Sequence, residues 1–283
     1  MRIVVTGGSG KLGLETLRQL IAAGHEVYNV DQVLPRVNLC KTMRMDFRDY
    51  GQVLEAFTHI EGGWDKPDCV VHLAAIPGPS HAANAALFHN NVIASFNVFW
   101  AAKAAGIKNV VWASSETVTG LPFDEPPPYL PIDEEIPRRP NWAYSLGKLL
   151  DEVMAEEFCR WDPDLKMIGL RISYVKDLED YKEFPALQDD PLKQHWNFWS
   201  YVDVRDAANA FVLAVERKTK GFETYNIFAA DTVMERPTAE LLAEVCPAVP
   251  LRREFGRNES VFLIEKAREE LGWSPKHSWR DLS

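Results

Sequence analysis

"RIVVTGGSGKLG", residues 2–13, is a short apolar run that passes directly into a glycine-rich turn. Gly8, Gly10 and Gly13 fit the spacing GxGxxG, and the residues that follow have helical period. Glycines at these places allow a tight turn, close approach of the backbone to a pyrophosphate, and close packing of a helix whose N-terminal amides face the negative charge. The stretch therefore predicts a strand, a dinucleotide-binding turn and a helix. A glycine-rich turn without a ligand is the alternative.

A second apolar run, "HEVYNV" at 25–30, is followed by Asp31, which lies 18 residues after Gly13. A carboxylate at the end of the second strand can accept hydrogen bonds from the adenosine ribose, and it would repel a 2′-phosphate. We therefore predict NAD as the cofactor. Arg36 lies close enough in sequence to leave NADP as the less favoured alternative.

Runs rich in Val and Ile alternate with segments of helical period along the rest of the chain. The further runs lie at 69–74, 109–114, 165–172 and 225–228, and the helical segments at 82–105, 142–160, 204–216, 238–245 and 260–271. Parallel strands need crossover connections, which helices supply. The alternation thus predicts an α/β fold with a parallel sheet covered on both faces.

Composition limits the classes of partner. The net charge of -10 disfavours binding to nucleic acid or to an anionic membrane surface. The chain shows no secretory signal and no apolar stretch approaching the ~20 residues that span a bilayer, so we expect a cytoplasmic protein. The four cysteines are widely spaced and form no CxxC pair, which predicts buried free thiols and no metal site.

Residues 121–140, "LPFDEPPPYLPIDEEIPRRP", contain seven prolines and cannot form a regular helix. The segment lies between a predicted strand and a predicted helix. A surface connector and a loop that covers a site are both compatible with its composition.

"NWAYSLGKLL", residues 141–150, places Tyr144 four positions before Lys148 at the start of a predicted helix. Side chains at this spacing lie on the same face. A phenol with its ordinary pKa of ~10 is a poor base at neutral pH unless a nearby cation favours its anion. The pair therefore predicts an acid/base group; an exposed tyrosine stacked beside a lysine is the alternative.

These features share their order and spacing with a known family. The motifs are the glycine loop at 6–13, "HLAA" at 72–75, "ASSETVTG" at 113–120, and Tyr144 with Lys148, followed by "SYVDVRDAANA" at 200–210 and "EKAREELGW" at 265–273. Together they resemble the extended short-chain dehydrogenase/reductase family, of the NAD-dependent epimerase/dehydratase type. The resemblance implies a doubly wound parallel sheet (Rossmann fold), with an NAD-binding domain at 1–171. It also implies a mainly substrate-binding portion at 172–283, interleaved with the first as one structural unit, and a homodimer formed through two helices per subunit.

The resemblance also implies the residues of the site. The cofactor-binding set is Gly7, Gly10, Lys11, Leu12, Gly13, Asp31, Asp46, Phe47, Leu73, Ala74, Ala75, Asn91, Tyr144, Lys148 and Ile172. The catalytic set is Ser115, Tyr144 and Lys148. In it Tyr144 takes the proton of a substrate hydroxyl, Lys148 holds the ribose and lowers the tyrosine pKa, and Ser115 donates a hydrogen bond to the reacting oxygen.

Substrate contacts are expected from a third set, which is Ser114, Glu116, Ser173, Lys182 and Trp199. Family dehydratases carry an Asp-Glu pair where this chain has Glu116 and Thr117, so dehydration is disfavoured. Nucleotide-sugar epimerases usually carry an arginine just before the segment matched by "SYVDV", where this chain has Trp199. In length and in its "ASS" and Trp199-Ser200 features the chain is most similar to uronate dehydrogenases of the family.

The main hypothesis is therefore an NAD-dependent oxidoreductase that moves hydride from a sugar-like hydroxyl, of a free sugar or sugar acid, to the nicotinamide. A nucleotide-sugar epimerase with tightly bound NAD would use the same residues and is one alternative. A noncatalytic dinucleotide-binding redox sensor is another, which the intact Ser115, Tyr144 and Lys148 set disfavours.

Overall fold

The chain forms the predicted strand, turn and helix at its start. The structure is a computed structural model that describes residues 1–60, 64–78 and 81–282. Strand β1 (Arg2–Thr6) sends Ile3 and Val5 into the core on one face of the sheet and Val4 into the core on the other, because side chains alternate along a strand. Apolar residues on both faces mark it as a central strand covered on both sides.

The central sheet is parallel and has the order β3-β2-β1-β4-β5-β6-β9. Besides β1, its strands are β2 (Glu26–Asp31), β3 (Thr42–Arg44), β4 (Cys69–His72), β5 (Asn109–Ser115), β6 (Lys166–Ile172) and β9 (Gly221–Ile227). The strand order reverses between β1 and β4, so the carboxyl ends of these two strands flank the crevice in which doubly wound folds bind ligands. The predicted Rossmann-type fold is confirmed.

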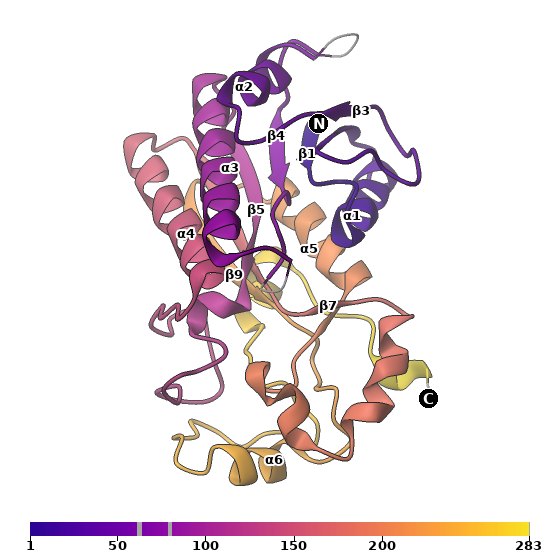
Figure 1. Ribbon diagram of the computed structural model, residues 1–283, viewed down its shortest axis with the longest axis vertical. Helices are drawn as coiled ribbons and strands as arrows, with labels where there is room; N and C mark the ends of the chain where they lie inside the picture. Colours follow the sequence, from indigo (N-terminus) through magenta and orange to yellow (C-terminus); the bar gives the residue numbers. More distant parts are fainter. Residues whose placement is uncertain (61–63, 79–80, 283) are drawn as a thin grey trace.

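Helices cover both faces of this sheet (Figure 1). One face carries α2 (Tyr50–Thr58), α3 (Asn84–Ala104) and α4 (Ala143–Trp161), with α3 packed between the other two. The opposite face carries α1 (Lys11–Ala22) and α5 (Val204–Glu216), which pack against each other. The catalytic tyrosine predicted from the sequence is thus placed by α4, and the glycine loop by β1 and α1.

A smaller portion of the chain lies beyond the carboxyl ends of the strands and carries α6 at the foot of Figure 1. Its elements are β7 (Val175–Lys176), β8 (Val202–Asp203), η2 (Asp180–Leu187), η3 (Pro191–Asn197), α6 (Thr238–Val245) and η5 (Trp279–Leu282). Turn η1 (Glu116–Thr119) follows β5, and the π-turn η4 (Ala267–Leu271) packs against α5 and β9. Both α5 and β9 return to the sheet from this portion. The boundary at residue 171 stays a prediction.

The proline-rich segment 121–140 is joined to the C-terminal part of the chain. Leu130 and Leu251 form one β-bridge, and Ile132 and Phe262 form another. The Arg252 guanidinium lies 3.2 Å from the ring centroid of Tyr129. These contacts attach the segment to the C-terminal part of the chain, and both readings, a surface connector and a loop that covers a site, stay predictions.

The predicted strands are confirmed with shifts of one or two residues at most ends, except that β9 begins at Gly221 instead of 225. Four of the five later helical segments are confirmed as α3, α4, α5 and α6. The prediction of a helix over 260–271 is wrong for its first half, because Phe262 lies in the bridge to Ile132. Strand β3 and helix α2 were not predicted.

The four cysteines are free thiols, and burial raises the pKa of both Cys69 and Cys159 to about 12. Within the described ranges no group of three His, Cys, Asp or Glu residues could hold a metal ion. Among the helices that the structure describes, none is both long and apolar enough to cross a membrane.

Candidate functional site

Two glycines of the loop, Gly7 and Gly13, leave no room for a side chain. Gly7 has a φ of 75°, and a Cβ there would lie 2.6 Å from the backbone nitrogen of Ala74. A Cβ on Gly13 would lie 2.1 Å from the carbonyl oxygen of Gly7. These two glycines therefore fix the loop against the end of β4 and against α1.

Gly10 differs, because a Cβ there would meet nothing closer than the Gly7 carbonyl oxygen at 3.5 Å. It is the N-cap of α1, and no side chain caps the amides of the first turn, which Lys11, Leu12 and Gly13 begin. Uncapped N-terminal amides beside an accessible glycine suit a pyrophosphate. This part of the predicted NAD site fits the cofactor.

The geometry gives a direct test at Gly10. In the Gly10→Ala variant we expect an unchanged melting temperature, because the backbone is extended (φ −78°, ψ 172°) and the added methyl has room. The methyl would stand where the pyrophosphate approaches, so NAD affinity should fall by about tenfold or more, which is about 1.4 kcal/mol. Calorimetric titration of the cofactor-free protein measures this, with Gly256→Ala as the control. Unchanged affinity would place the pyrophosphate elsewhere.

Lys11 is part of the predicted cofactor set, and its side chain crosses to the C-terminal portion. Its ammonium forms ion pairs with Asp177, at 3.2 Å, and with Asp180. The ion pairs join the start of α1 to the turn before η2. Lys11 thus lies next to the glycine loop and is already paired with two carboxylates of the C-terminal portion.

Asp31 ends β2 beside the glycine loop. Its carboxylate accepts hydrogen bonds from the backbone nitrogens of Ser9, at 2.9 Å, and Val33, at 3.1 Å, one on each oxygen. A carboxylate has about four acceptor positions, so two remain for ribose hydroxyls. The place and orientation fit the predicted ribose contact.

The expected adenine contacts differ from each other. Asp46 is at the surface, and hydrogen bonds from the Arg48 side chain lower its pKa to about 2. The ring of Phe47 is buried in the core beside His72. If adenine binds here, it would meet the Asp46 side chain and the backbone of Phe47, but not the Phe47 ring.

The wall opposite the glycine loop is formed by Leu73, Ala74 and Ala75, which follow β4 and are half-buried. Asn91 on α3 fixes the continuation of this wall, because its amide accepts from Ile76 N at 2.8 Å and donates to Ile76 O at 3.0 Å. The Asn91 amide is therefore occupied, which makes it a support of the wall. Ile172 ends β6 and is buried.

Tyr144 and Lys148 lie on one face of α4, as their spacing predicts. The Lys148 ammonium is 6.0 Å from the centroid of the tyrosine ring. It donates to the carbonyl oxygen of Ala113 on β5 at 2.7 Å and lies 3.4 Å from the buried carboxylate of Asp151. Desolvation raises the pKa of Asp151 to about 6, so this carboxylate is mostly charged at neutral pH and holds Lys148 in place. Within the described residues the Tyr144 hydroxyl has no hydrogen-bond partner, which leaves it available to a substrate.

Ser115 ends β5 and caps the η1 turn. Its oxygen accepts hydrogen bonds from the backbone nitrogen of Thr117, at 3.2 Å, and from the Thr117 hydroxyl, at 3.0 Å. With its lone pairs engaged, the Ser115 hydroxyl has its hydrogen left to donate, as stabilisation of a developing oxyanion requires. Thr117 was not predicted to support the site; a hydroxyl two residues after a capping serine is the signal that could have found it.

Ser114, which the sequence placed among the substrate contacts, points the other way. Its hydroxyl donates to the carboxylate of Glu152 at 2.7 Å, and both side chains are buried. Glu152 in turn accepts two hydrogen bonds from the guanidinium of Arg171, each at 2.9 Å. Neighbouring residues of a strand face opposite sides of the sheet, so Ser114 cannot share the site with Ser115.

Two further predicted substrate contacts are a fully buried side chain and a largely exposed one. Trp199 is fully buried, and its indole nitrogen donates to the carbonyl oxygen of Pro191 at 2.6 Å. Lys182 has 71% of its side chain exposed and pairs with Glu179 on its own turn. The prediction that Trp199 and Lys182 contact the substrate is therefore not supported, because one is a core side chain and the other faces solvent. Glu116 and Ser173, in contrast, lie directly behind Ser115 and bond to each other at 2.8 Å.

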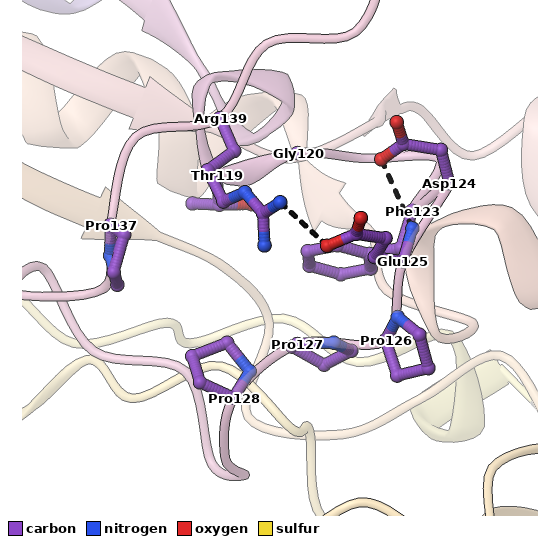
Figure 2. A pocket seen from close by; sticks show the side chains of 10 residues that line it. All are labelled: Thr119, Gly120, Phe123, Asp124, Glu125, Pro126, Pro127, Pro128, Pro137 and Arg139. Carbon is purple, nitrogen blue, oxygen red and sulfur yellow. Dashed lines mark hydrogen bonds and ion pairs between the residues drawn. The ribbon is translucent and has the colours of Figure 1, made fainter.

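A small cavity in the proline-rich segment follows the η1 turn (Figure 2). In the figure the Arg139 guanidinium points at Glu125, with which it forms an ion pair at 2.6 Å. The cavity measures only about 10 Å³, roughly room for one water molecule. It cannot hold a sugar ring, whereas residues 134–138 of the same segment line part of a second cavity of about 370 Å³.

Comparisons with known proteins point to one family. A sequence model of the NAD dependent epimerase/dehydratase family matches residues 3–176. The UDP-glucose 4-epimerase of Corynebacterium glutamicum is 27% identical over 311 residues, which cover 98% of this chain and 92% of that protein. The UDP-glucose 4-epimerase of Lacticaseibacillus casei is 27% identical over 323 residues, with 98% and 92% covered.

Solved structures agree with the fold. A UDP-galactose 4-epimerase superposes with a TM-score of 0.70 at 28% identity, covering 98% of this chain and 94% of that chain. The UDP-glucose-4-epimerase of Stenotrophomonas maltophila, with bound NAD and formylated UDP-arabinopyranose, superposes with a TM-score of 0.75 at 22% identity, covering 99% and 95%.

Proposed function

Since the chain belongs to the NAD dependent epimerase/dehydratase family, we propose that it is an epimerase of nucleotide sugars that uses NAD retained in its site. The single observation that carries the proposal is the arrangement of the Tyr144 ring over Lys148, whose ammonium binds the carbonyl oxygen of Ala113, two residues before Ser115 on β5. Relatives named as UDP-glucose 4-epimerases that align over nearly the whole chain support the substrate class.

The three catalytic side chains have separate tasks in this proposal. Tyr144 takes the proton of a sugar hydroxyl while the attached carbon is oxidised to a carbonyl, and Lys148 stabilises its phenolate. Ser115 donates a hydrogen bond to the same oxygen. NAD, when bound, supplies the hydride acceptor and, in an epimerase, the hydride donor of the return step. Tyr144 would return the proton to the carbonyl oxygen, and the configuration would be inverted where the carbonyl carbon receives its hydride on the opposite face.

The dehydrogenase favoured by the sequence is the second candidate. One observation supports it: the position where an arginine is expected in nucleotide-sugar epimerases holds Trp199, whose side chain is fully buried. The finer likeness to uronate dehydrogenases has no support among the relatives named above, which are epimerases. The comparisons therefore favour the alternative over the first reading. A noncatalytic sensor is disfavoured by the intact catalytic set.

The epimerase and the dehydrogenase differ in the products that they release. The purified protein is incubated with NAD and two panels, one of UDP- and TDP-sugars and one of free sugars and sugar acids. An epimerase converts a nucleotide sugar to its epimer, seen by chromatography, without net NADH. Steady accumulation of NADH absorbance with a free sugar would instead support the dehydrogenase, and no change in either panel would reject both.

We also propose a homodimer formed through α3 and α4, whose contact with each other is visible in Figure 1. Their outer face exposes large apolar side chains at helical spacing, which are Ile93, Phe96 and Trp100 on α3 and Leu146, Val153 and Trp161 on α4. Contiguous apolar patches of this kind mark protein contacts. A cytoplasmic location stays a prediction.

Phe96 gives the test of this interface. Phe96→Glu puts a charge in the centre of the apolar face, where 41% of the side chain is exposed in the single chain, so we expect the mass measured by light scattering to fall from dimer to monomer. Ile21→Glu, on α1 with 39% exposed, is the matched control and should leave the dimer intact. A wild-type protein that is monomeric would refute the proposal.

A further inference from the structure

Glu116 follows Ser115 directly and is almost completely buried. One carboxyl oxygen, Oε2, lies 2.8 Å from the hydroxyl of Ser173, at the end of β6, and the other, Oε1, accepts from the amide of Asn197, at the end of η3, at 3.3 Å. The side chain thus connects three segments that are distant in the sequence. All three meet at the carboxyl ends of the strands, behind the catalytic serine.

No cation balances this carboxyl group among the described residues. The charged or titratable groups on the elements around it bind elsewhere: Lys148 binds Ala113 and Asp151, Arg171 binds Glu152, Lys193 binds the carbonyl of Ala186, and His195 binds the carbonyl of Leu192. Tyr144, on the packed helix α4, makes no hydrogen bond to it. Burial therefore raises the pKa of Glu116 from its ordinary 4.5 to about 8, although the bonds from Ser173 and Asn197 oppose the shift.

The turn that Asn197 begins is strained. Phe198 and Trp199 have φ angles of 52° and 58°, a left-handed conformation that costs free energy for residues other than glycine. The Asn197 amide also donates to the carbonyl oxygen of Ser200 at 2.9 Å, which closes the turn. The same amide therefore holds the strained turn and binds Glu116.

We propose that Glu116 is a positioning residue that fixes the strained turn 197–200 and the end of β6 against the Ser115 turn, and so sets the shape of the substrate pocket. This inference rests on the proposed function. The carboxyl group acts uncharged: protonated on Oε2, it donates to the Ser173 hydroxyl, which reverses the bond that Ser173 donates to the ionised group, while Oε1 still accepts from Asn197. It does not give up its proton during turnover, and when ionised it leaves a buried charge that no cation compensates.

Glu116→Gln tests the uncharged role, because the amide keeps the size and can make both hydrogen bonds. We expect near-normal kcat/KM at pH 7. Above the pKa of about 8, the ratio of wild-type to Gln-variant kcat/KM should fall about tenfold for each pH unit. Taking the ratio cancels every pH effect that the two proteins share. Glu116→Ala should raise KM about tenfold, more than it lowers kcat, because the turn loses its anchor.

Glu134→Gln is the matched control, since burial also raises the pKa of Glu134 but the residue binds the backbone of Asn226 instead. The ratio of wild-type to Glu134→Gln kcat/KM should not change with pH. A Glu116→Gln variant as inactive as Glu116→Ala would overturn the proposal, because the carboxyl group would then be needed as a proton donor or charge. The proposal would also be overturned if the ratio of wild-type to Glu116→Gln kcat/KM did not change between pH 7 and pH 9.5.

Thermal unfolding separates failure of this inference from failure of the proposed function. A buried acid with a raised pKa contributes stability that is complete below about 4.5 and is lost as pH rises to about 8. The melting temperature of Glu116→Gln should therefore exceed that of wild type by a margin that grows across this window and then stays constant. If no sugar is turned over, the proposed function fails, and a constant difference in melting temperature would overturn the inference by itself.

Discussion

The Tyr144→Phe variant is expected to turn over its sugar about 10²–10⁴ times more slowly than the wild-type protein. Phenylalanine keeps the ring beside Lys148 and Trp142 but removes the hydroxyl that would exchange a proton with the substrate. NAD affinity should change little, because the glycine loop and Asp31 are untouched. Product analysis of the nucleotide-sugar panel measures the first effect, and calorimetric titration the second.

Tyr50→Phe is the matched control: it removes the same hydroxyl group from a tyrosine at the start of α2, a helix that carries none of the proposed catalytic residues. Its turnover should equal that of wild type. Normal turnover by Tyr144→Phe, with the protein folded, would remove Tyr144 from the mechanism and with it the main support for the proposed function.

The Arg171→Met variant is expected to lose about 3 kcal/mol of unfolding free energy, the lower end of the range for breaking a buried ion pair, because the buried carboxylate of Glu152 then keeps only Arg138, at 3.6 Å, as a cation. The carboxylate of Glu152 is fully buried and takes two of its hydrogen bonds from the Arg171 guanidinium. Ser114, which also donates to it, cannot neutralise its charge. Urea denaturation followed by circular dichroism measures the loss.

A double variant, Arg171→Met with Glu152→Leu, tests the cause. Removing both charges should restore most of the lost stability, since buried ion pairs replaced by apolar residues are often neutral for stability. Lys182→Met breaks an exposed pair with Glu179 and should leave the unfolding curve unchanged. If the double variant is no more stable than Arg171→Met, the loss comes from packing and not from an unpaired charge.

The geometry of the glycine loop, of Asp31 and of the Tyr144–Lys148 pair could be predicted from the sequence because it depends on local spacing. Gly7, Gly10 and Gly13 lie within one turn, and Asp31 follows at the end of the next strand. Tyr144 and Lys148 share a helix face by spacing alone. In each case a few neighbouring residues decide the geometry, and a period of 3.6 or 2 locates them.

The substrate half could not be predicted in the same way. Its side chains come from segments whose orientation depends on long-range packing: Trp199 is buried only because the left-handed turn after Asn197 rotates it inward. Ser114 is next to Ser115 in the sequence, but strand alternation sends the two side chains to opposite faces, and Ser114 binds Glu152. Glu116 was named as a substrate contact, but its bonds to Ser173 and Asn197 join positions 57 and 81 residues away.

Strand β9 can pair with β6 only late in synthesis, because the chain returns to the sheet after the smaller portion has been made. Strand β6 (Lys166–Ile172) has its outer edge covered by β9 (Gly221–Ile227), and about fifty residues lie between them. At ribosomal rates of about 5–20 residues per second, β6 waits several seconds with an open, apolar edge before its partner emerges. During this interval we expect the nascent chain to be open to strand pairing with other chains along the uncovered edge of β6.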